Sequence, residues 1–272
     1  MAHATIFSAP PRQLEAAREL SHAAVQWPSR AARANLSSVA DDSHSNLGWD
    51  EASFSLLSHP LDADQRYQLG FCFESFAMVW CEDGAVTETL PLIESSEAEA
   101  QAWCDNRLAG AGLTRTGSAT MPYSLEAVDY RDFAGAASLT ELETLGAWFS
   151  MGQSVLDGLV EAYGDTAVAT ARVRCWPHHY DLGALFSLEA GDPETARSIG
   201  VGLSPGDGNY AEPYFYCTPW PTPAAFHAPP SPMHWHTDGF TSMVCKASLV
   251  EESLDLTQLL ATAFSTARGS LN

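Results

Sequence analysis

Four of the nine histidines occur in two short segments of the second half of the chain, and each segment also contains an aspartate. In an extended backbone, residues i and i+2 point to the same face. The spacing therefore predicts two pairs of side chains that each share a face: His179 with Asp181, and His234 with His236.

Together the two pairs would supply three imidazoles and one carboxylate, a ligand set suited to zinc, manganese or iron. Asp181 is also a candidate catalytic residue, and Glu212 is a second one. Glu212 and Asp238 could each serve as an extra ligand or as a general base. The pattern lacks the fixed spacing of a motif such as H-E-x-x-H. A metal site, a metal-free cleft for a small polar molecule and purely structural roles therefore all stay open.

Further residues near these segments are candidates for binding a ligand. Arg172 and Arg174 are spaced to share a face, and a guanidinium fork suits a carboxylate or a phosphate. In so acidic a chain, ion pairing with acidic neighbours is the plainer interpretation of these arginines. The candidate ligand-binding residues are Arg174, Trp176, His178, Tyr180 and Asp207.

Residues 202–206 read Gly-Leu-Ser-Pro-Gly and match the G-x-S-x-G pattern of the nucleophile elbow in α/β-hydrolases. The residue after the nucleophile must donate its backbone N–H to the oxyanion hole, and Pro205 has none. The elbow must also open a helix, whereas residues 207–209 predict a turn. We therefore interpret Ser204 as part of a loop between two strands.

Three stretches of the second half, 172–188, 198–223 and 234–250, resemble a family of uncharacterised bacterial proteins, a domain of unknown function. The motifs that carry the resemblance are Tyr180-Asp181-Leu182, Pro205-Gly206-Asp207 and Glu212-Pro213-Tyr214-Phe215-Tyr216. The resemblance implies a folded unit that includes Asp181. It implies no activity.

Helical periodicity and end signals predict four main helices, over 11–27, 96–108, 138–164 and 256–264. Pro28 is expected to end the first, and a Ser-x-x-Glu capping box opens each of the next two. A change of parity after Ser75 suggests a bulge or a twist in a long strand, and residues 82–84 predict a hairpin turn. Strands are expected at 67–80, 86–92, 167–176, 182–188, 198–203, 212–220 and 240–250.

The two halves of the chain have similar layouts, each reading helix, strands, helix. Residues 44–48 align with 179–183, and residues 54–56 align with 186–188. These matches predict an internally duplicated α+β protein with mostly antiparallel sheets, helices packed on one face and halves related by a pseudo-two-fold axis. The first repeat would span 1–115, and the second, 116–272, would carry the candidate site, or both would form one compact domain.

Composition narrows the functional classes. The chain has 272 residues, 46% of them hydrophobic, and a net charge of −21 with a single lysine, Lys246. Such an acidic protein repels nucleic acid and anionic lipid. No apolar run approaches the roughly 20 residues of a membrane-spanning helix. The N-terminus lacks the features of a signal peptide, and the six cysteines contain no C-x-x-C pair.

We therefore expect a cytoplasmic protein without nucleic-acid or membrane partners, whose cysteines are buried apolar residues. The favoured function is binding of a small molecule, or metal-assisted catalysis, in a cleft lined by histidine, aspartate and aromatic residues. The alternative is a non-enzymatic, partner-binding protein that uses the aromatic, proline-rich loop 218–232.

Overall fold

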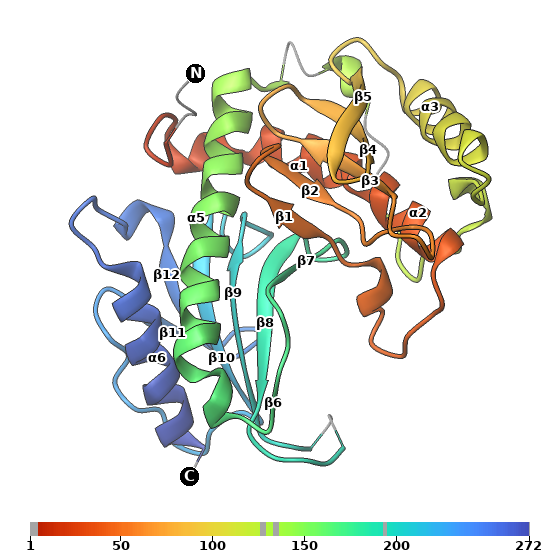
Figure 1. The fold of residues 1–272 in the computed structure, drawn as a ribbon. Helices are drawn as coiled ribbons and strands as arrows, with labels where there is room; N and C mark the ends of the chain where they lie inside the picture. Colours follow the sequence, from red (N-terminus) through yellow and green to blue (C-terminus); the bar gives the residue numbers. More distant parts are fainter. Residues whose placement is uncertain (1–4, 126–128, 133–135, 193–194, 272) are drawn as a thin grey trace. The chain divides into compact units, whose positions relative to one another are not determined.

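The computed structural model describes residues 5–125, 129–132, 136–192 and 195–271. Helices and two antiparallel sheets make it an α+β fold, as the sequence predicts (Figure 1). The chain divides into two compact units, the first from residues 1–150 and 175–180 and the second from residues 151–174 and 181–272. The division thus falls inside a long helix, and residues 116–150, expected in the second repeat, belong to the first unit.

The first unit is built on a five-stranded antiparallel sheet whose strands follow one another in sequence order. The strands are β1 (Gly48–Asp50), β2 (Ser55–Leu57), β3 (Tyr67–Cys72), β4 (Ala77–Glu82) and β5 (Ala85–Pro91). The helices are α1 (Glu15–Ala24), α2 (Gln26–Asn35), α3 (Glu97–Gly110) and the first half of α5 (Leu139–Tyr163).

Two sequence predictions in this unit are wrong. The single helix expected over 11–27 is interrupted at Val25, and Pro28 lies in the first turn of α2. Proline is tolerated there because the first turn of a helix does not use its N–H groups for internal hydrogen bonds. The change of parity after Ser75 is a turn between β3 and β4, not a bulge, and it holds Phe76 at a φ of 45°.

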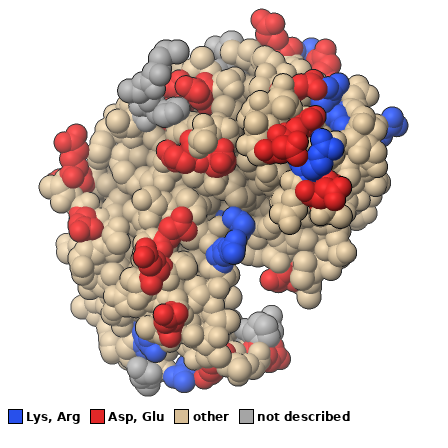
Figure 2. All heavy atoms as spheres, in the orientation of Figure 1, with Lys and Arg blue, Asp and Glu red and all other residues tan. Residues whose placement is uncertain are grey.

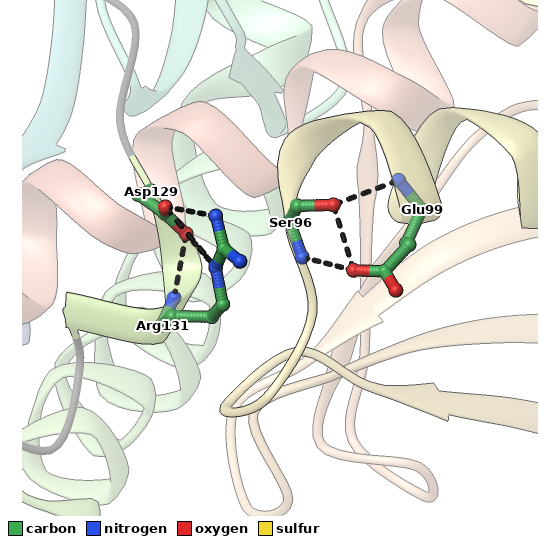
Figure 3. A network of polar contacts seen from close by, with 4 residues as sticks. All are labelled: Ser96, Glu99, Asp129 and Arg131. Carbon is green, nitrogen blue, oxygen red and sulfur yellow. Dashed lines mark hydrogen bonds and ion pairs between the residues drawn. The ribbon is translucent and has the colours of Figure 1, made fainter.

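Other local predictions are confirmed. Asp83 and Gly84 form the turn between β4 and β5, both with a positive φ as a two-residue hairpin turn requires. The predicted capping box opens α3: Ser96 accepts the backbone N–H of Glu99, whose carboxylate accepts the N–H of Ser96 (Figure 3). The same pair of bonds joins Ser138 and Glu141 at the start of α5.

The second unit is built on an antiparallel sheet in the order β11-β12-β10-β9-β8-β6. These strands are β6 (Ala169–Thr170), β8 (Asp181–Ser187), β9 (Ser198–Ser204), β10 (Tyr214–Trp220), β11 (His234–His236) and β12 (Ser242–Lys246). The short β7 (Arg174–Trp176) lies where the chain passes from the second unit to the first. The second half of α5 and α6 (Leu256–Ser270) cover one face of the sheet (Figure 1).

Alternate residues of the central strands of this sheet form the core beneath these two helices. All are buried and apolar: Leu182, Ala184, Phe186, Ile199, Val201, Leu203, Phe215, Cys217, Met243 and Cys245. Because side chains alternate between the faces of a strand, the residues between them point to the opposite face. That face is made mostly of glycine, serine, tyrosine and histidine.

Two glycines in the second half of α5 have different surroundings. A Cβ on Gly152 would lie 2.5 Å from Cδ2 of Leu203, so the helix packs closely on β9 at this point. A Cβ on Gly158 would meet only Cγ2 of Thr257, at an ordinary contact distance of 3.7 Å.

We therefore expect opposite effects from two alanine substitutions in α5. Gly152→Ala should lower the free energy of unfolding by about 1–3 kcal/mol because the methyl group overpacks the core. Gly158→Ala should raise it by about 0.5–1 kcal/mol because alanine loses less backbone entropy in a helix. Urea denaturation of both variants measures the difference, and equal effects would contradict the packing of α5 on β9.

The sequence match between the two halves does not fall on equivalent strands. Residues 44–48 lead into β1, which is an edge strand of the first sheet. Residues 179–183 lead into β8, which lies between β9 and β6 in the second sheet. The alignment of these two segments therefore does not support the predicted duplication.

The surface and the cysteines agree with the composition. Acidic side chains are spread over the face drawn in Figure 2, and basic ones occur in fewer places. All six cysteines are free and buried. None of the helices in the described ranges is both long enough and apolar enough to cross a membrane.

Candidate functional site

The uncovered face of the second sheet brings together several of the predicted site residues. Its central row, set by the strand register, runs Gly183, Gly202, Tyr216, Val244, His234. The two flanking rows are Ser204, Tyr214, Lys246 and Gly200, Thr218, Ser242, His236. We call these residues, together with Asp181 and the loop residues Asp207 and Tyr210, the tyrosine face.

Tyr216 lies flat across the glycines of the two neighbouring strands. A Cβ on Gly202 would overlap the Tyr216 ring, and a Cβ on Gly183 would lie 3.0 Å from its hydroxyl oxygen. The hydroxyl reaches the start of β8, where it donates to Oδ2 of Asp181 at 2.5 Å. The glycines therefore make room for a tyrosine–carboxylate pair that spans three strands.

A second tyrosine–carboxylate pair lies beside the first. Tyr214 donates its hydroxyl proton to Oδ2 of Asp207 at 2.8 Å. Oδ1 of Asp207 accepts the backbone N–H groups of Asn209 and Tyr210, which holds the loop after β9 in a turn. Burial, followed by the hydrogen bond to Asp207, raises the pKa of Tyr214, so this hydroxyl stays protonated at neutral pH.

Tyr210 connects the two predicted histidines. Its hydroxyl lies 2.9 Å from Nε2 of His234 and 2.8 Å from Nδ1 of His236. Nε2 of His236 lies 2.6 Å from the backbone oxygen of Asp238. β11 is extended and pairs both histidines with β12, so the two imidazoles share one face.

The backbone oxygen of Asp238 sets the direction of the hydrogen bonds that link His236, Tyr210 and His234. A carbonyl oxygen can only accept, so Nε2 of His236 carries a proton, and Nδ1 of the neutral ring accepts from Tyr210. The Tyr210 oxygen then accepts the Nε2 proton of His234. The neutral imidazoles and the phenol thus form a directed relay from His234 to the Asp238 carbonyl, which we call the histidine relay.

Burial and neighbouring charges favour the neutral form of His234. Burial is the main cause that lowers the pKa of His234, and the charge of Lys246, or of His236 when that ring is protonated, lowers it further. His234 is therefore uncharged at pH 7. The charged groups of the tyrosine face are then the carboxylates of Asp181 and Asp207 and the ammonium of Lys246.

The other predicted histidines belong to the first unit. Residues 177–180 form a turn, in which the N–H groups of His179 and Tyr180 both donate to the carbonyl of Trp176. The predicted shared face of His179 and Asp181 is therefore wrong, because the backbone is not extended before Asp181. His178 and His179 are exposed, with ring centroids 4.1 Å apart.

Tyr180, predicted to bind a ligand, is instead a core residue of the first unit. Its side chain is 1% exposed and stacks on His22, with ring centroids 5.0 Å apart. Its φ of 59° places it in the left-handed region, which is rare for an aromatic residue. Its neighbour Trp176 is half-buried and contacts the ring of His178 edge to face.

Two further candidates have local roles. Glu212 is 3% exposed, and its carboxylate accepts the backbone N–H of Ser248 at 2.6 Å. This contact ties the start of β10 to the segment after β12. Arg174 is half-buried, and its pKa is lowered mainly by burial and then by the charge of Arg172. Ser204 was expected in a loop but is the last residue of β9, where it is buried and its hydroxyl accepts the N–H of Gly206 in the loop that follows.

In the described ranges, no group of three or more His, Cys, Asp or Glu side chains is placed to hold a metal ion. The imidazoles of His234 and His236 are both bonded to the Tyr210 hydroxyl. The described residues thus provide no set of ligands for the metal site predicted in the second half of the chain.

The sequence reasoning missed the residues that organise this site. Tyr210, Tyr214 and Tyr216 supply the three hydroxyls that hold the two carboxylates and the two imidazoles. One signal was readable: Gly200 with Gly202 and Tyr214 with Tyr216 are i, i+2 pairs on strands expected to be neighbours. Glycines opposite tyrosines predict aromatic rings lying over a flat part of a sheet.

No family model matches the chain, and neither a curated protein nor a solved structure matches it. The resemblance to an uncharacterised bacterial family therefore stays a prediction.

Proposed function

We propose that the tyrosine face binds a small, positively charged molecule that is rich in hydrogen-bond donors. The observation that carries the proposal is the pair of tyrosine–carboxylate hydrogen bonds, Tyr216 to Asp181 and Tyr214 to Asp207. Gly200, Tyr216 and both carboxylates are half-exposed, so a ligand can reach them from solvent.

Hydrogen-bonding capacity favours a ligand that donates. Tyr214 and Tyr216 each direct their one hydroxyl proton to a carboxylate. Tyr214 is buried, whereas the half-exposed Tyr216 presents its oxygen to other groups as an acceptor. The carboxylates are acceptors too. With His234 donating through Nε2, its second ring nitrogen is also an acceptor.

Charge favours a cationic ligand. Two carboxylates against one lysine give the tyrosine face a net negative charge while the imidazoles are neutral. The faces of tyrosine rings attract cations, by about 0.5–1 kcal/mol at exposed sites. The net charge of −21 raises the local concentration of cations around the whole protein. An ammonium or guanidinium ligand meets all three conditions.

The histidine relay adds acid–base chemistry to this binding site. Neutral His234 is able to accept a proton at Nδ1. Its Nε2 proton then passes to the Tyr210 oxygen and the Tyr210 proton to Nδ1 of His236, so the positive charge ends on His236. We propose this as the metal-free route by which the site would catalyse a reaction of a bound amine. The proposal of binding does not depend on it.

Calorimetry with simple cations tests the binding proposal. We expect methylguanidinium to bind the wild-type chain and Asp207→Asn to weaken binding about tenfold, since one charge-assisted contact is lost. Glu252→Gln is the matched control because Glu252 is an exposed carboxylate of the same unit outside the tyrosine face. Equal losses in both variants would show general charge attraction and contradict a specific site.

A specific observation favours the second candidate function, partner binding by loop 218–232. Trp220 and Phe226 are 41% and 46% exposed, which is unusual for large aromatic side chains. Phe226 packs on Trp235, with ring centroids 4.8 Å apart. Phe226→Ala separates the two proposals, because it should leave methylguanidinium binding unchanged while weakening a partner that docks on the loop.

We also propose that the two units arose by duplication, on grounds other than the short sequence matches. Strands β2-β3-β4-β5 and β8-β9-β10-β12 are consecutive antiparallel neighbours, and each set precedes a side-chain-capped helix, α3 or α6. Gly70 pairs with Leu57 as Gly202 pairs with Gly183, and each of these two strand glycines is crowded by a neighbouring backbone carbonyl.

This register points to a specialised second unit. The position of Tyr216 opposite Gly202 is occupied by Val79 opposite Gly70 in the first unit. Val79 packs there with Cys72, Cys81 and Leu57 in an apolar cluster. The tyrosine–carboxylate pairs would thus be a property of the second unit alone.

Six free cysteines support a reducing compartment such as the cytoplasm.

A further inference from the structure

The first unit contains a pocket of about 220 Å³ that plays no part in the proposed function. We call it the Arg30 pocket. Its polar and aromatic lining comes from α2, the start of α3 and the segment before α5: Gln26, Trp27, Arg30, Glu97, Tyr123 and Tyr130. Ala23, Met121 and Leu125 add an apolar lining.

Arg30 differs from the arginines near it. Arg18 on α1 forms an ion pair with Glu15, and Arg33 on α2 forms one with Asp42. Arg30 has no such pair within the described ranges, and its guanidinium lies 4.9 Å from the centre of the Trp27 ring. Its Nε is buried without a hydrogen-bond partner there. Arg30 is thus a partly buried cation in the wall of the pocket that forms no ion pair with a described carboxylate.

A second donor lines the same pocket. The Tyr130 hydroxyl accepts the indole N–H of Trp27 at 3.1 Å, and no described residue accepts its own proton. Tyr130 is 1% exposed, and burial raises its pKa, so the proton is retained. Tyr123, by contrast, donates its proton to Oε1 of Gln26 at 2.8 Å. Arg30 and Tyr130 therefore each line the pocket with a donor that no described residue accepts.

Neighbouring contacts hold these walls in place. The capping box of Ser96 and Glu99 sets the start of α3, which carries Glu97 (Figure 3). A fork of hydrogen bonds from the Arg131 guanidinium to Asp129 brackets Tyr130 in its short 3-10 helix (Figure 3). The hydroxyl donor of Tyr130 is thus positioned by the residues on both sides of Tyr130 in the sequence.

We infer that the Arg30 pocket binds a small aromatic monocarboxylate. The guanidinium of Arg30 and the hydroxyl of Tyr130 would bind the carboxylate of the ligand. Its aromatic ring would pack against the rings of Trp27 and Tyr130 and the apolar lining. The pocket is smaller than the roughly 300–1,000 Å³ of drug-sized sites, which suits a single ring. Glu97 is exposed and lines the pocket, so a second negative charge would be repelled.

Calorimetry with benzoate and its neutral analogue benzamide tests this inference on the wild-type chain. We expect benzoate to bind at least about tenfold more tightly than benzamide, because only the anion pairs with Arg30. Phthalate, a dianion of similar shape, should also bind more weakly than benzoate. Equal binding of benzoate and benzamide, or no benzoate binding up to about 10 mM, would overturn the inference.

Two arginine variants of α2 then locate the site. Arg30→Gln should weaken benzoate binding at least about tenfold, whereas Arg33→Gln, which removes the same charge one turn away, should leave it within about twofold. Equal losses in the two variants would overturn the inference. Arg30→Lys, which keeps the charge but not the fork, should give an intermediate affinity. Methylguanidinium binding should be unchanged in all three arginine variants. A failure of the benzoate inference is therefore distinguishable from a failure of the proposed cation binding by the tyrosine face.

Discussion

Gly202→Ala is expected to lower the free energy of unfolding by about 3 kcal/mol, because the new methyl group has no space on either side. It would overlap both the carbonyl oxygen of Leu182 on β8 and the ring of Tyr216 on β10. The ring can rotate away, but the carbonyl belongs to a paired strand and moves only with the sheet. Rotation of the ring would also break the hydrogen bond to Asp181.

Gly200→Ala provides the matched control for this prediction. Gly200 lies on the same strand and the same face, and a Cβ there would meet only Cβ of Thr218, at 3.9 Å. Alanine should therefore leave the free energy of unfolding unchanged or raise it by up to about 1 kcal/mol, since it restricts the unfolded chain. Urea denaturation compares the two variants. Equal destabilisation would mean that Tyr216 does not lie across the sheet at Gly202.

Tyr180→Ala should have an even larger effect, a loss of about 3–5 kcal/mol, because it removes a fully buried aromatic side chain. The ring packs between His22 and Phe149 in the first unit, with centroid distances of 5.0 and 5.2 Å. The backbone adds a second reason: a φ of 59° is strained for an aromatic residue, and the packing of the ring helps to hold it there. Thermal and urea denaturation both report this loss.

His178→Ala is the control, since His178 is a neighbouring candidate from the same segment but is exposed. Its effect should stay within about 0.5 kcal/mol. If Tyr180→Ala were as mild as His178→Ala, the side chain of Tyr180 would be accessible, and its predicted role in ligand binding would return.

Features that depend on local sequence were predictable. The capping boxes at Ser96 and Ser138 and the turn at Asp83 and Gly84 each involve residues within four positions of one another. The α+β class with antiparallel sheets followed from the alternation of large residues in short strands joined by turns.

Features that depend on long-range register were not predictable. Tyr216 meets Asp181 because three strands pair in one register, which brings together residues 35 positions apart. The turn before Asp181 was also hidden, since nothing local in the sequence shows that Tyr180 adopts a positive φ. The prediction of an extended segment there followed from spacing alone, and spacing carries no information on turns.

NMR of the chain with ¹³C-labelled tyrosine rings, recorded during titration with methylguanidinium, tests cation binding by the tyrosine face. We expect saturable shifts of the ring signals of Tyr210, Tyr214 and Tyr216, while the signals of Tyr67 and Tyr163, on other elements, stay unchanged. Tyr210→Phe, Tyr214→Phe and Tyr216→Phe assign the three signals. Saturable shifts confined to tyrosines outside the tyrosine face, or none at all, would contradict a cation-binding site there.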